Sequence, residues 1–344
     1  MTLGFDTPVL DRLAHVSEAR GALALGDRLA SLDRWVRADL VELEAELAAI
    51  PRGERVAHAA AHHLLDSRGK HLRPLCVALA SRFGDGFGPR ARSLAVAVEM
   101  VHSATLLHDD VVDVADRRRG EPTARIVYGN AASIFAGDWL LVTALRRITR
   151  AGVEGLLERM LDVIEDMIVA ESIQLERRGK VDGARDDYMR IVEGKTCALF
   201  RWAMLAGARA AGMTAAEQAA FDRYGLHLGF AFQAVDDELD FADGTGKDPL
   251  VDLREGKMTF PLVVALERDA SLRDRIVGML AGEPTAEELA SIATRVRGCG
   301  ALAATRRLAE DHAARSLEAL TALPAGAARD ALETVAIASL ERTS

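Results

Sequence analysis

Two stretches of the sequence decide the fold: residues 101–113, VHSATLLHDDVVD, and residues 230–240, FAFQAVDDELD. Each runs from apolar residues at helical spacing into the pattern Asp-Asp-x-x-Asp. Residues four positions apart lie on the same face of a helix, so Asp109 is expected above Asp113 and Asp236 above Asp240. Paired carboxylates repel each other unless a cation lies between them, and such hard oxygen ligands suit Mg²⁺.

A single acidic pair of this kind would be interpreted as a solvated helix face. The apolar sequence directly before both pairs argues against that interpretation, because a buried carboxylate without a partner or a metal costs several kcal/mol. We therefore predict two acidic units that face each other across a cavity and, with Mg²⁺, bind a diphosphate.

The remainder of the chain indicates an all-α fold, a single-domain helical bundle around a central cavity. Of the 344 residues, 49% are hydrophobic but only 5% are aromatic, which favours closely packed helices over a β-sandwich. Thr214 and Asn130 are candidate helix caps, and no strand-like alternation of useful length is present. Residues 1–25 are expected to form an extension of unknown role, and residues 26–344 the domain. Helical periodicity predicts helices over 27–49, 56–66, 73–83, 90–116, 131–149, 155–178, 186–212, 215–240, 259–267, 286–298, 301–321 and 326–341.

Charge and composition exclude several classes of protein. The net charge of −9 gives no general attraction to nucleic acid or to anionic membranes. The three cysteines lie far apart and in no metal-binding spacing, as expected for reduced thiols in the cytoplasm. No segment is long and apolar enough to span a bilayer, and the first 25 residues lack the order of a signal peptide.

An acidic protein that binds a diphosphate needs local cations, and several are clustered. Lys70 and Arg73 lie one turn apart after Gly69, whose backbone can approach an anion. A cation and a hydroxyl, Lys195 and Thr196, stand in the middle of an apolar helix. Further candidates are His102, two turns before Asp109, the arginines at 117–119, and Lys247, Arg254 and Lys257 in an irregular segment, 242–258, that we interpret as a lid.

With these motifs in order, the chain resembles the trans-isoprenyl diphosphate synthases of the polyprenyl synthetase family, of the medium- and long-chain type, from about residue 30 to the C-terminus. Two departures are visible: Arg68 and His71 replace residues of the usual Gly-Gly-Lys-Arg motif, and the lid is a few residues short. The supporting motifs are Gly69-Lys70-His71-Leu72-Arg73-Pro74, His102 before the first acidic unit, Arg118-Arg119-Gly120, Gly137-Asp138, Glu171 with Gln174, Gly194-Lys195-Thr196, Phe232-Gln233, and Glu255-Gly256-Lys257-Met258-Thr259.

The resemblance implies that isopentenyl diphosphate condenses with an allylic diphosphate, assisted by about three Mg²⁺. The expected metal ligands are Asp109, Asp113, Asp236 and Asp240, and Asp110 and Asp237 are expected to support them. Arg118, Lys195, Lys247 and Lys257 are expected to bind the allylic diphosphate. Gly69, Lys70, Arg73, His102 and Arg119 are expected to bind isopentenyl diphosphate. Thr196 and Gln233 are expected to stabilise the allylic cation, which completes a catalytic set with Asp109, Asp113, Arg118, Lys195, Asp236 and Lys257.

The length of the product depends on residues below the first acidic unit. One helical turn rises about 5.4 Å, close to one extended isoprene unit, so the residues one turn before Asp109 line the channel floor. Ala104 and Thr105 are small, and Val101 beyond them is not aromatic. By family resemblance, short-chain enzymes place an aromatic residue there. We therefore expect a C25–C40 product, with Phe135 or Trp139 of a neighbouring helix as a candidate floor.

The sequence also allows other functions: a geranylgeranyl (C20) diphosphate synthase, a non-catalytic partner subunit of a heteromeric synthase, a class I terpene cyclase and a His-Asp phosphohydrolase. The phosphohydrolase is suggested only by His108-Asp109 and His62-His63. The family also implies a homodimer formed through helices such as 131–149, where Ile134, Phe135, Leu140, Leu141 and Leu145 exceed what one side of a helix needs.

Overall fold

The computed structural model describes residues 23–67, 69, 71–118, 120–183, 185–241, 250–282 and 284–341, and these residues are almost entirely helical. The first half contains α2 Leu23–Ala48, α3 Val56–Leu65, α4 Leu72–Ser81, α5 Pro89–Val112, α6 Ala124–Tyr128, α7 Asn130–Ala151 and α8 Leu156–Arg177. The second half contains α9 Arg185–Val192, the π-helical turn η1 Glu193–Cys197, α10 Ala198–Ala210, α11 Ala215–Asp240, α12 Val251–Arg254, α13 Phe260–Arg268, α14 Ser271–Leu280, α15 Ala286–Gly298, α16 Ala301–Leu320 and α17 Ala327–Leu340.

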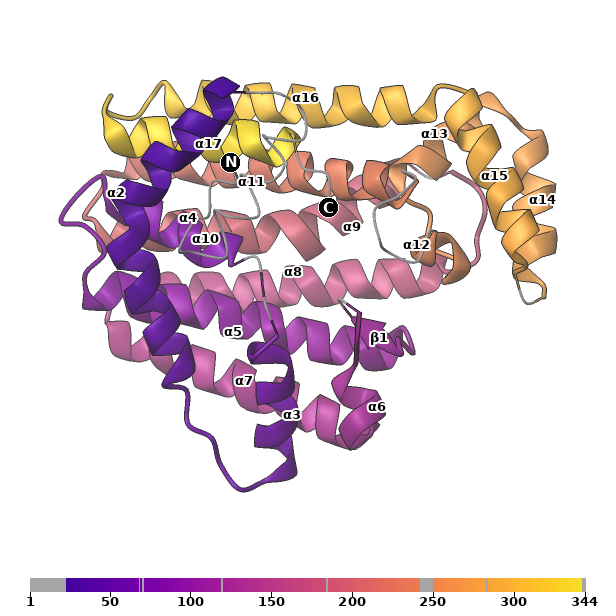
Figure 1. The fold of residues 1–344 in the computed structure, drawn as a ribbon. Helices are drawn as coiled ribbons and strands as arrows, with labels where there is room; N and C mark the ends of the chain where they lie inside the picture. Colours follow the sequence, from indigo (N-terminus) through magenta and orange to yellow (C-terminus); the bar gives the residue numbers. More distant parts are fainter. Residues whose placement is uncertain are drawn as a thin grey trace.

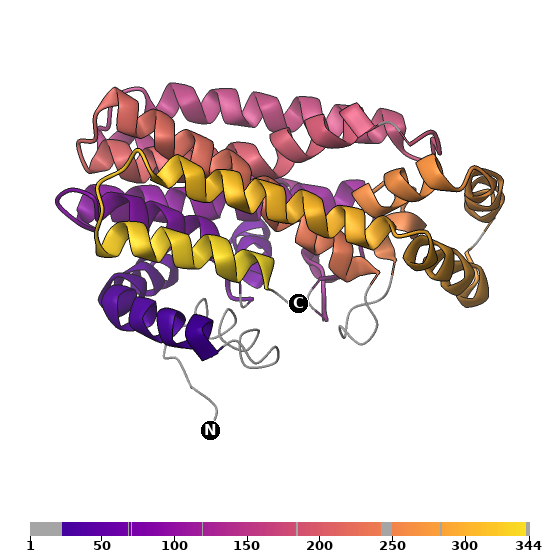
Figure 2. The same ribbon diagram turned by 90° about the horizontal axis from the view of Figure 1, so that it is seen from above.

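The long helices α5, α8, α11 and α16 all run along the length of the molecule, while α14 and α15 project at one end (Figure 1). Helix α5 packs along α7 and α4, and α11 packs along α10 and α16. Seen from above, α8 lies along one edge of the bundle, α2 lies at the opposite edge, and α16 and α17 run between them (Figure 2). The predicted all-α fold is confirmed, and both acidic units lie on long helices of the bundle.

Small side chains let the central helices approach closely. Gly229 of α11 lies against η1, where an added Cβ would come within 2.7 Å of the Cys197 Cα atom. Fully buried large side chains, among them Phe200, Trp202 and Tyr224, fill the remaining core. A second apolar cluster around Leu253, Val264, Ile276 and Val296 supports α12–α15 beside the site. The second acidic unit is thereby fixed between two packed regions.

The helix boundaries agree with the sequence periodicity to within a few residues, with informative exceptions. The predicted helix 90–116 ends at Val112, so Asp113 is the C-terminal cap rather than a residue inside the helix. The predicted helix 186–212 is interrupted by η1. The helices α6, α12 and α14 were not predicted, and α12 lies within the segment 242–258 that was expected to be irregular. The antiparallel pair β1 Arg117–Arg118 with β2 Glu121–Pro122 was not predicted either.

The two cap predictions had different outcomes. Thr214 forms a capping box with Glu217, as expected for the start of α11. The prediction for Asn130 was wrong, because α7 begins at Asn130 and Gly129 occupies the cap position. Among the described helices, none combines the length and the hydropathy needed to cross a bilayer. Residues 1–22 lie outside the described part of the chain, and α2 begins at Leu23.

Candidate active site

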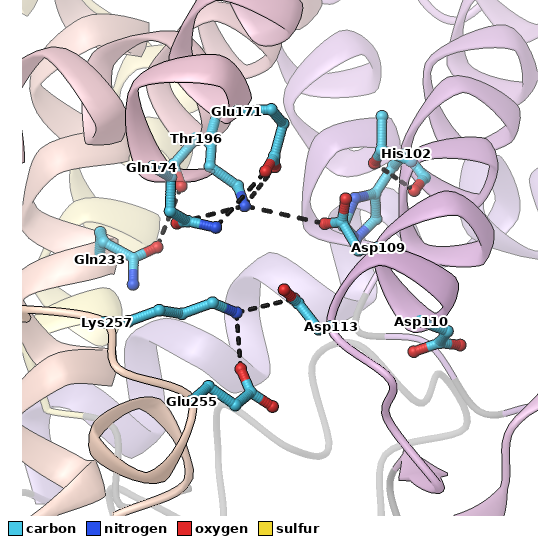
Figure 3. A network of polar contacts seen from close by, with 12 residues as sticks. His102, Asp109, Asp110, Asp113, Glu171, Gln174, Thr196, Gln233, Glu255 and Lys257 are labelled. Atoms are coloured by element: carbon cyan, nitrogen blue, oxygen red, sulfur yellow. Dashed lines mark hydrogen bonds and ion pairs between the residues drawn. The ribbon is translucent and has the colours of Figure 1, made fainter. Parts of the chain in front are cut away.

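The first acidic unit lies at the C-terminal end of α5 and presents two of its three carboxylates to the site. Asp109 and Asp113 face the polar network, whereas Asp110 points away from it (Figure 3). The buried Asp110 accepts a hydrogen bond from Arg118 Nε at 2.9 Å. It also forms an ion pair with Arg118 Nη2 at 2.8 Å. Burial raises the pKa of Asp110, although Arg118 opposes that shift. Asp110 therefore anchors the β1 strand to α5.

Asp113 is held by cations from two other segments. The Lys257 ammonium donates to Asp113 Oδ2 at 2.7 Å and also pairs with Glu255 at 2.7 Å. Arg178, directly after α8, donates to Asp113 Oδ1. Burial alone would lower the pKa of Lys257, but attraction to Asp113, Asp252 and Glu255 raises it overall. Lys257 thus stays charged and already bridges the loop after α12 to α5.

A second lysine, Lys195 of η1, lies near the other site-facing carboxylate of α5, Asp109. The Lys195 Nζ atom pairs with Glu171, lies 3.4 Å from Gln174 Oε1 and is 3.9 Å from Asp109 Oδ2. Burial raises the pKa of Asp109 to about 6, and the charge of Lys195 opposes the shift. Burial thus makes the charged form of Asp109 less favourable than in water, and additional positive charge would stabilise that form.

The π-helical turn explains how Lys195 and Thr196 reach the site from the middle of a buried helix. The extra residue per turn rotates both side chains toward the cavity, a common use of such turns at functional sites. Gly194 permits this geometry because it lies against α8, where an added Cβ would be 2.6 Å from Asp166 O and 2.7 Å from Ala170 Cβ. The motif Gly194-Lys195-Thr196 therefore has a steric reason as well as a chemical one.

The second acidic unit, on α11, divides its carboxylates in the same way. Asp237 is buried and accepts hydrogen bonds from the Tyr188 hydroxyl at 2.8 Å, Gln233 Nε2 at 2.9 Å and the Phe260 backbone N–H at 3.1 Å. Burial raises the pKa of Asp237 to about 7 against the effect of these hydrogen bonds. Asp236 and Asp240, four residues apart on α11, are more exposed. Asp237 thus fixes α11 to α9 and to the start of α13.

Hydrogen bonding also orients the polar groups between the two units. Gln233 donates its amide N–H to Asp237, so its Oε1 atom is turned toward Thr196, whose hydroxyl donates to it at 3.0 Å. A cavity of about 190 Å³ opens here, lined by Gln174, Lys195, Thr196, Gln233, Asp252 and Lys257 among others. The structure therefore places four of the predicted site residues around one cavity: Lys195, Lys257, Thr196 and Gln233.

Two residues of this region had not been identified from the sequence. Asp252 lines the cavity, and burial raises its pKa, while the charges of Lys257 and Lys195 oppose that shift. Its position five residues before Lys257 was the only available signal. No signal in the sequence indicated a role of Arg178 in the site, because adjacent arginines at a helix end normally indicate a solvated surface.

The expected sites for isopentenyl diphosphate are described only in part. Arg73 stacks over the Phe200 ring, with the guanidinium carbon 4.7 Å from the ring centre, and burial lowers its pKa. Gly69 is buried, and His102 lies on α5 with its backbone oxygen accepting from Thr105 at 2.8 Å. Lys70, Arg119 and Lys247 lie outside the described residues.

The proposed channel floor is corrected by the structure. Val101 and Ala104 are buried on α5, as expected for residues below Asp109. Phe135, however, is 61% exposed on α7, so it does not close a channel within this chain. Trp139 packs against His58 with ring centres 4.6 Å apart. The helical pattern of residues 131–149 was right, but it did not reveal which face of α7 meets the core.

Comparisons with known proteins agree with this geometry. The Polyprenyl synthetase family model matches residues 54–296. The octaprenyl diphosphate synthase of Escherichia coli (strain K12) is 35% identical over 285 residues, covering 82% of this chain and 88% of that protein. The structure of a polyprenyl synthase from Caulobacter crescentus CB15, complexed with calcium and isoprenyl diphosphate, is 36% identical, with a TM-score of 0.85, and covers 92% of this chain and 98% of that one.

A decaprenyl diphosphate synthase from Rhodobacter capsulatus is 31% identical with a TM-score of 0.85, and covers 92% of this chain and 99% of that one. The fold and the matches define an isoprenoid synthase of the all-α type. The chain belongs to the polyprenyl synthetase family. The prediction of a trans-prenyltransferase is thereby confirmed.

Enzymes of this family typically depend on a divalent metal, and the donor atoms of the site fit one. Among the described residues, no group of three or more His, Cys, Asp or Glu side chains is already arranged around a metal position. Three cations, Lys195, Lys257 and Arg178, lie against Asp109 and Asp113 in this structure. The carboxylate oxygens are nevertheless the ligands that Mg²⁺ prefers.

The close contact of Gly194 with α8 leads to a prediction. Gly194→Ala should lower the free energy of unfolding by about 1–3 kcal/mol, because the new methyl group overlaps Asp166 O. It should also displace Lys195 and slow prenyl transfer by roughly a hundredfold. Chemical denaturation and steady-state rates measure the two effects.

The matched control is Gly278→Ala on α14, where an added Cβ meets nothing within 4 Å. That variant should be about 0.5–1 kcal/mol more stable, because alanine favours helix, and equally active. A Gly194→Ala protein with the stability and rate of the parent would contradict the steric argument.

Proposed function

We propose that the protein joins isopentenyl diphosphate to an allylic prenyl diphosphate and repeats the addition to give an all-trans product of C25–C40. The observation that carries this proposal is the pairing of two acidic units with lysines that already reach across to the first of them. Lys195 approaches Asp109 from η1, and Lys257 donates to Asp113 from the loop after α12. The carboxylates can bind Mg²⁺ and the lysines can bind phosphate oxygens, so the arrangement suits a metal-bound diphosphate between α5 and α11.

In the proposed site, Asp109 and Asp113 of α5 and Asp236 and Asp240 of α11 would hold Mg²⁺, with about three ions per site. Bound there, Mg²⁺ would neutralise the charge that develops on the leaving diphosphate. Lys195 and Lys257 would bind the outer oxygens of that diphosphate, and Lys247 is expected to join them. Arg118 would act there too, although in this structure it holds Asp110.

The next step in the proposal is cleavage of the allylic C–O bond, which leaves a carbocation in the cavity. The Gln233 carbonyl oxygen and the Thr196 hydroxyl oxygen present negative dipoles to that space, and Asp237 keeps the amide in this orientation. The double bond of isopentenyl diphosphate, held by Gly69, Lys70, Arg73, His102 and Arg119, would attack the cation. Loss of a proton to the departing diphosphate would complete the addition.

The function is tested by mass analysis of the products formed from isopentenyl diphosphate, farnesyl diphosphate and Mg²⁺. The parent should give a ladder ending between C25 and C40. The double variant Asp109→Ala, Asp236→Ala should lose at least about a thousandfold in rate, because both acidic units lose a ligand. The control Asp162→Ala, Asp186→Ala removes two exposed carboxylates and should retain the parent rate.

Elongation by the double acidic variant at the parent rate would exclude the proposal. A parent product that stops at C20 would make the protein a geranylgeranyl diphosphate synthase. A parent inactive by itself but active with a second chain would make it one subunit of a heteromeric synthase.

Product length depends in this proposal on the small side chains of α5. Ala104 is 1% exposed and lies on α5 between Val101 and Asp109, so Ala104→Phe should narrow the channel. We expect products shorter by one or more isoprene units, because the ring occupies about one helical turn of channel. Val277→Phe, on the exposed side of α14, places the same ring far from the channel and should leave the products unchanged. A folded Ala104→Phe enzyme with the parent product distribution would show that α5 does not line the channel.

We further propose a homodimer formed through α7 and α8. Large apolar side chains are exposed on both helices, among them Ile134, Phe135 and Val142 on α7 and Leu161 and Ile168 on α8. The two helices contact each other, so these side chains form an apolar surface larger than a single chain needs. Phe135 then belongs to an interface between subunits rather than to the interior.

Phe135→Glu should weaken the dimer, because a charge would be buried among apolar groups in the interface. Sedimentation velocity over a range of protein concentrations measures the shift toward the monomer. Val277→Glu, which adds the same charge to α14, should sediment like the parent. A parent protein that remains a single chain at all concentrations would rule out the dimer.

The compartment and the domain division are also proposals. The free thiols Cys76, Cys197 and Cys299 suit a reducing compartment, and we propose the cytoplasm. The division into an extension, residues 1–25, and a polyprenyl synthetase domain, residues 26–344, rests on the sequence.

A further inference from the structure

Arg178 occupies a position at the site that none of the expected substrate or metal contacts uses. It follows α8 directly, and its guanidinium donates to Asp113 Oδ1 and, at 3.4 Å, to Val112 O. The contact joins the end of α8 to the end of α5. Because Asp113 is an expected metal ligand, a cation on its carboxylate competes with any metal for the same oxygen atoms.

The backbone around Arg178 is fixed from the opposite side. The Gly179 N–H donates to Gly256 O at 2.9 Å, which ties the end of α8 to the loop that carries Lys257. Gly256 has a φ of +74° and lies so close that an added Cβ would be 3.0 Å from Gly179 N. Arg178 and Lys257 therefore approach Asp113 from adjoining segments, one at each carboxylate oxygen.

The guanidinium is not fully satisfied in this position. Arg178 Nε is buried and has no hydrogen-bond acceptor among the described residues. The neighbouring Arg177 differs, because it pairs with Asp182 and, at 3.0 Å, with Asp187 at the start of α9. Arg177 lines the cavity but is paired with two carboxylates, whereas Arg178 Nε has donor capacity left over beside Asp113.

We propose that Arg178 holds Asp113 while the enzyme is free of metal and moves to the diphosphate when Mg²⁺ binds Asp113. The inference rests on the metal site of the proposed function. A divalent ion at Asp113 repels the guanidinium and removes its acceptor. The diphosphate brought in beside Asp113 offers new oxygens within reach of the same side chain, so the backbone does not have to move.

The proposal makes Arg178 act with opposite signs on two ligands. While it occupies Asp113, it lowers the apparent affinity for Mg²⁺, since only the fraction of molecules with a free carboxylate binds the ion. Once displaced, it adds a charge-assisted hydrogen bond to the diphosphate. A simple structural clamp between α8 and α5 would instead favour both ligands or neither.

The test measures both affinities by isothermal titration calorimetry on the full chain. Mg²⁺ is titrated without substrate, and inorganic diphosphate is titrated at saturating Mg²⁺. Arg178→Gln should bind Mg²⁺ about tenfold more tightly than the parent. It should bind diphosphate about tenfold more weakly. Arg178→Lys keeps the charge but not the planar pair of donors, so both shifts should be smaller.

Arg159→Gln removes the same charge from the first turn of α8, where Arg159 pairs with Asp162 at 3.5 Å, and should leave both affinities near the parent values. An Arg178→Gln protein whose Mg²⁺ affinity is unchanged or weaker overturns the inference. Asp113→Asn separates this result from a failure of the metal site itself. If that variant binds Mg²⁺ like the parent, Asp113 is not a ligand, and both the metal site at Asp113 and the role of Arg178 are excluded.

Discussion

The structure depends on balancing carboxylates from two helices against cations from segments far away in the sequence. Asp109 and Asp113 end α5, and the positive charges that face them come from η1, from the end of α8 and from the loop after α12. None of these groups is well solvated, so each would be costly without the others. Besides binding ligands, these charges therefore join the ends of elements that are far apart in the sequence.

Each acidic unit separates support from function by position. The second aspartate of each unit turns inward, Asp110 to Arg118 and Asp237 to Tyr188, Gln233 and the Phe260 N–H. In the first unit, the first and last aspartates, Asp109 and Asp113, face the polar network instead and are paired there with cations. The Asp-Asp-x-x-Asp pattern provides for both roles. The middle aspartate anchors one face of the helix, and the other two, which repel each other, share a different face.

Much of this architecture could be predicted from the sequence, because helical periodicity and the acidic units are local signals. The start of α11 at the Thr214 capping box and the supporting positions of Asp110 and Asp237 are examples. What failed depended on contacts between distant residues. The π turn at Glu193–Cys197 arises from the approach of Gly194 to α8, and the exposure of Phe135 depends on which face of α7 meets α5. Arg178 was missed because its partner lies 65 positions away.

The ion pairs also bear on how such a site can be rigid and still accept a highly charged substrate. If the acidic units were unpaired before binding, their repulsion would spread the helices and the geometry would have to be rebuilt at each turnover. Side-chain cations instead hold the carboxylates in place, and Lys257 and Arg178 are mounted on segments joined by the Gly179–Gly256 hydrogen bond. Exchange of these cations for metal requires only side-chain rotation. Most of the ordering is therefore completed during folding, and binding energy remains available for breaking the C–O bond.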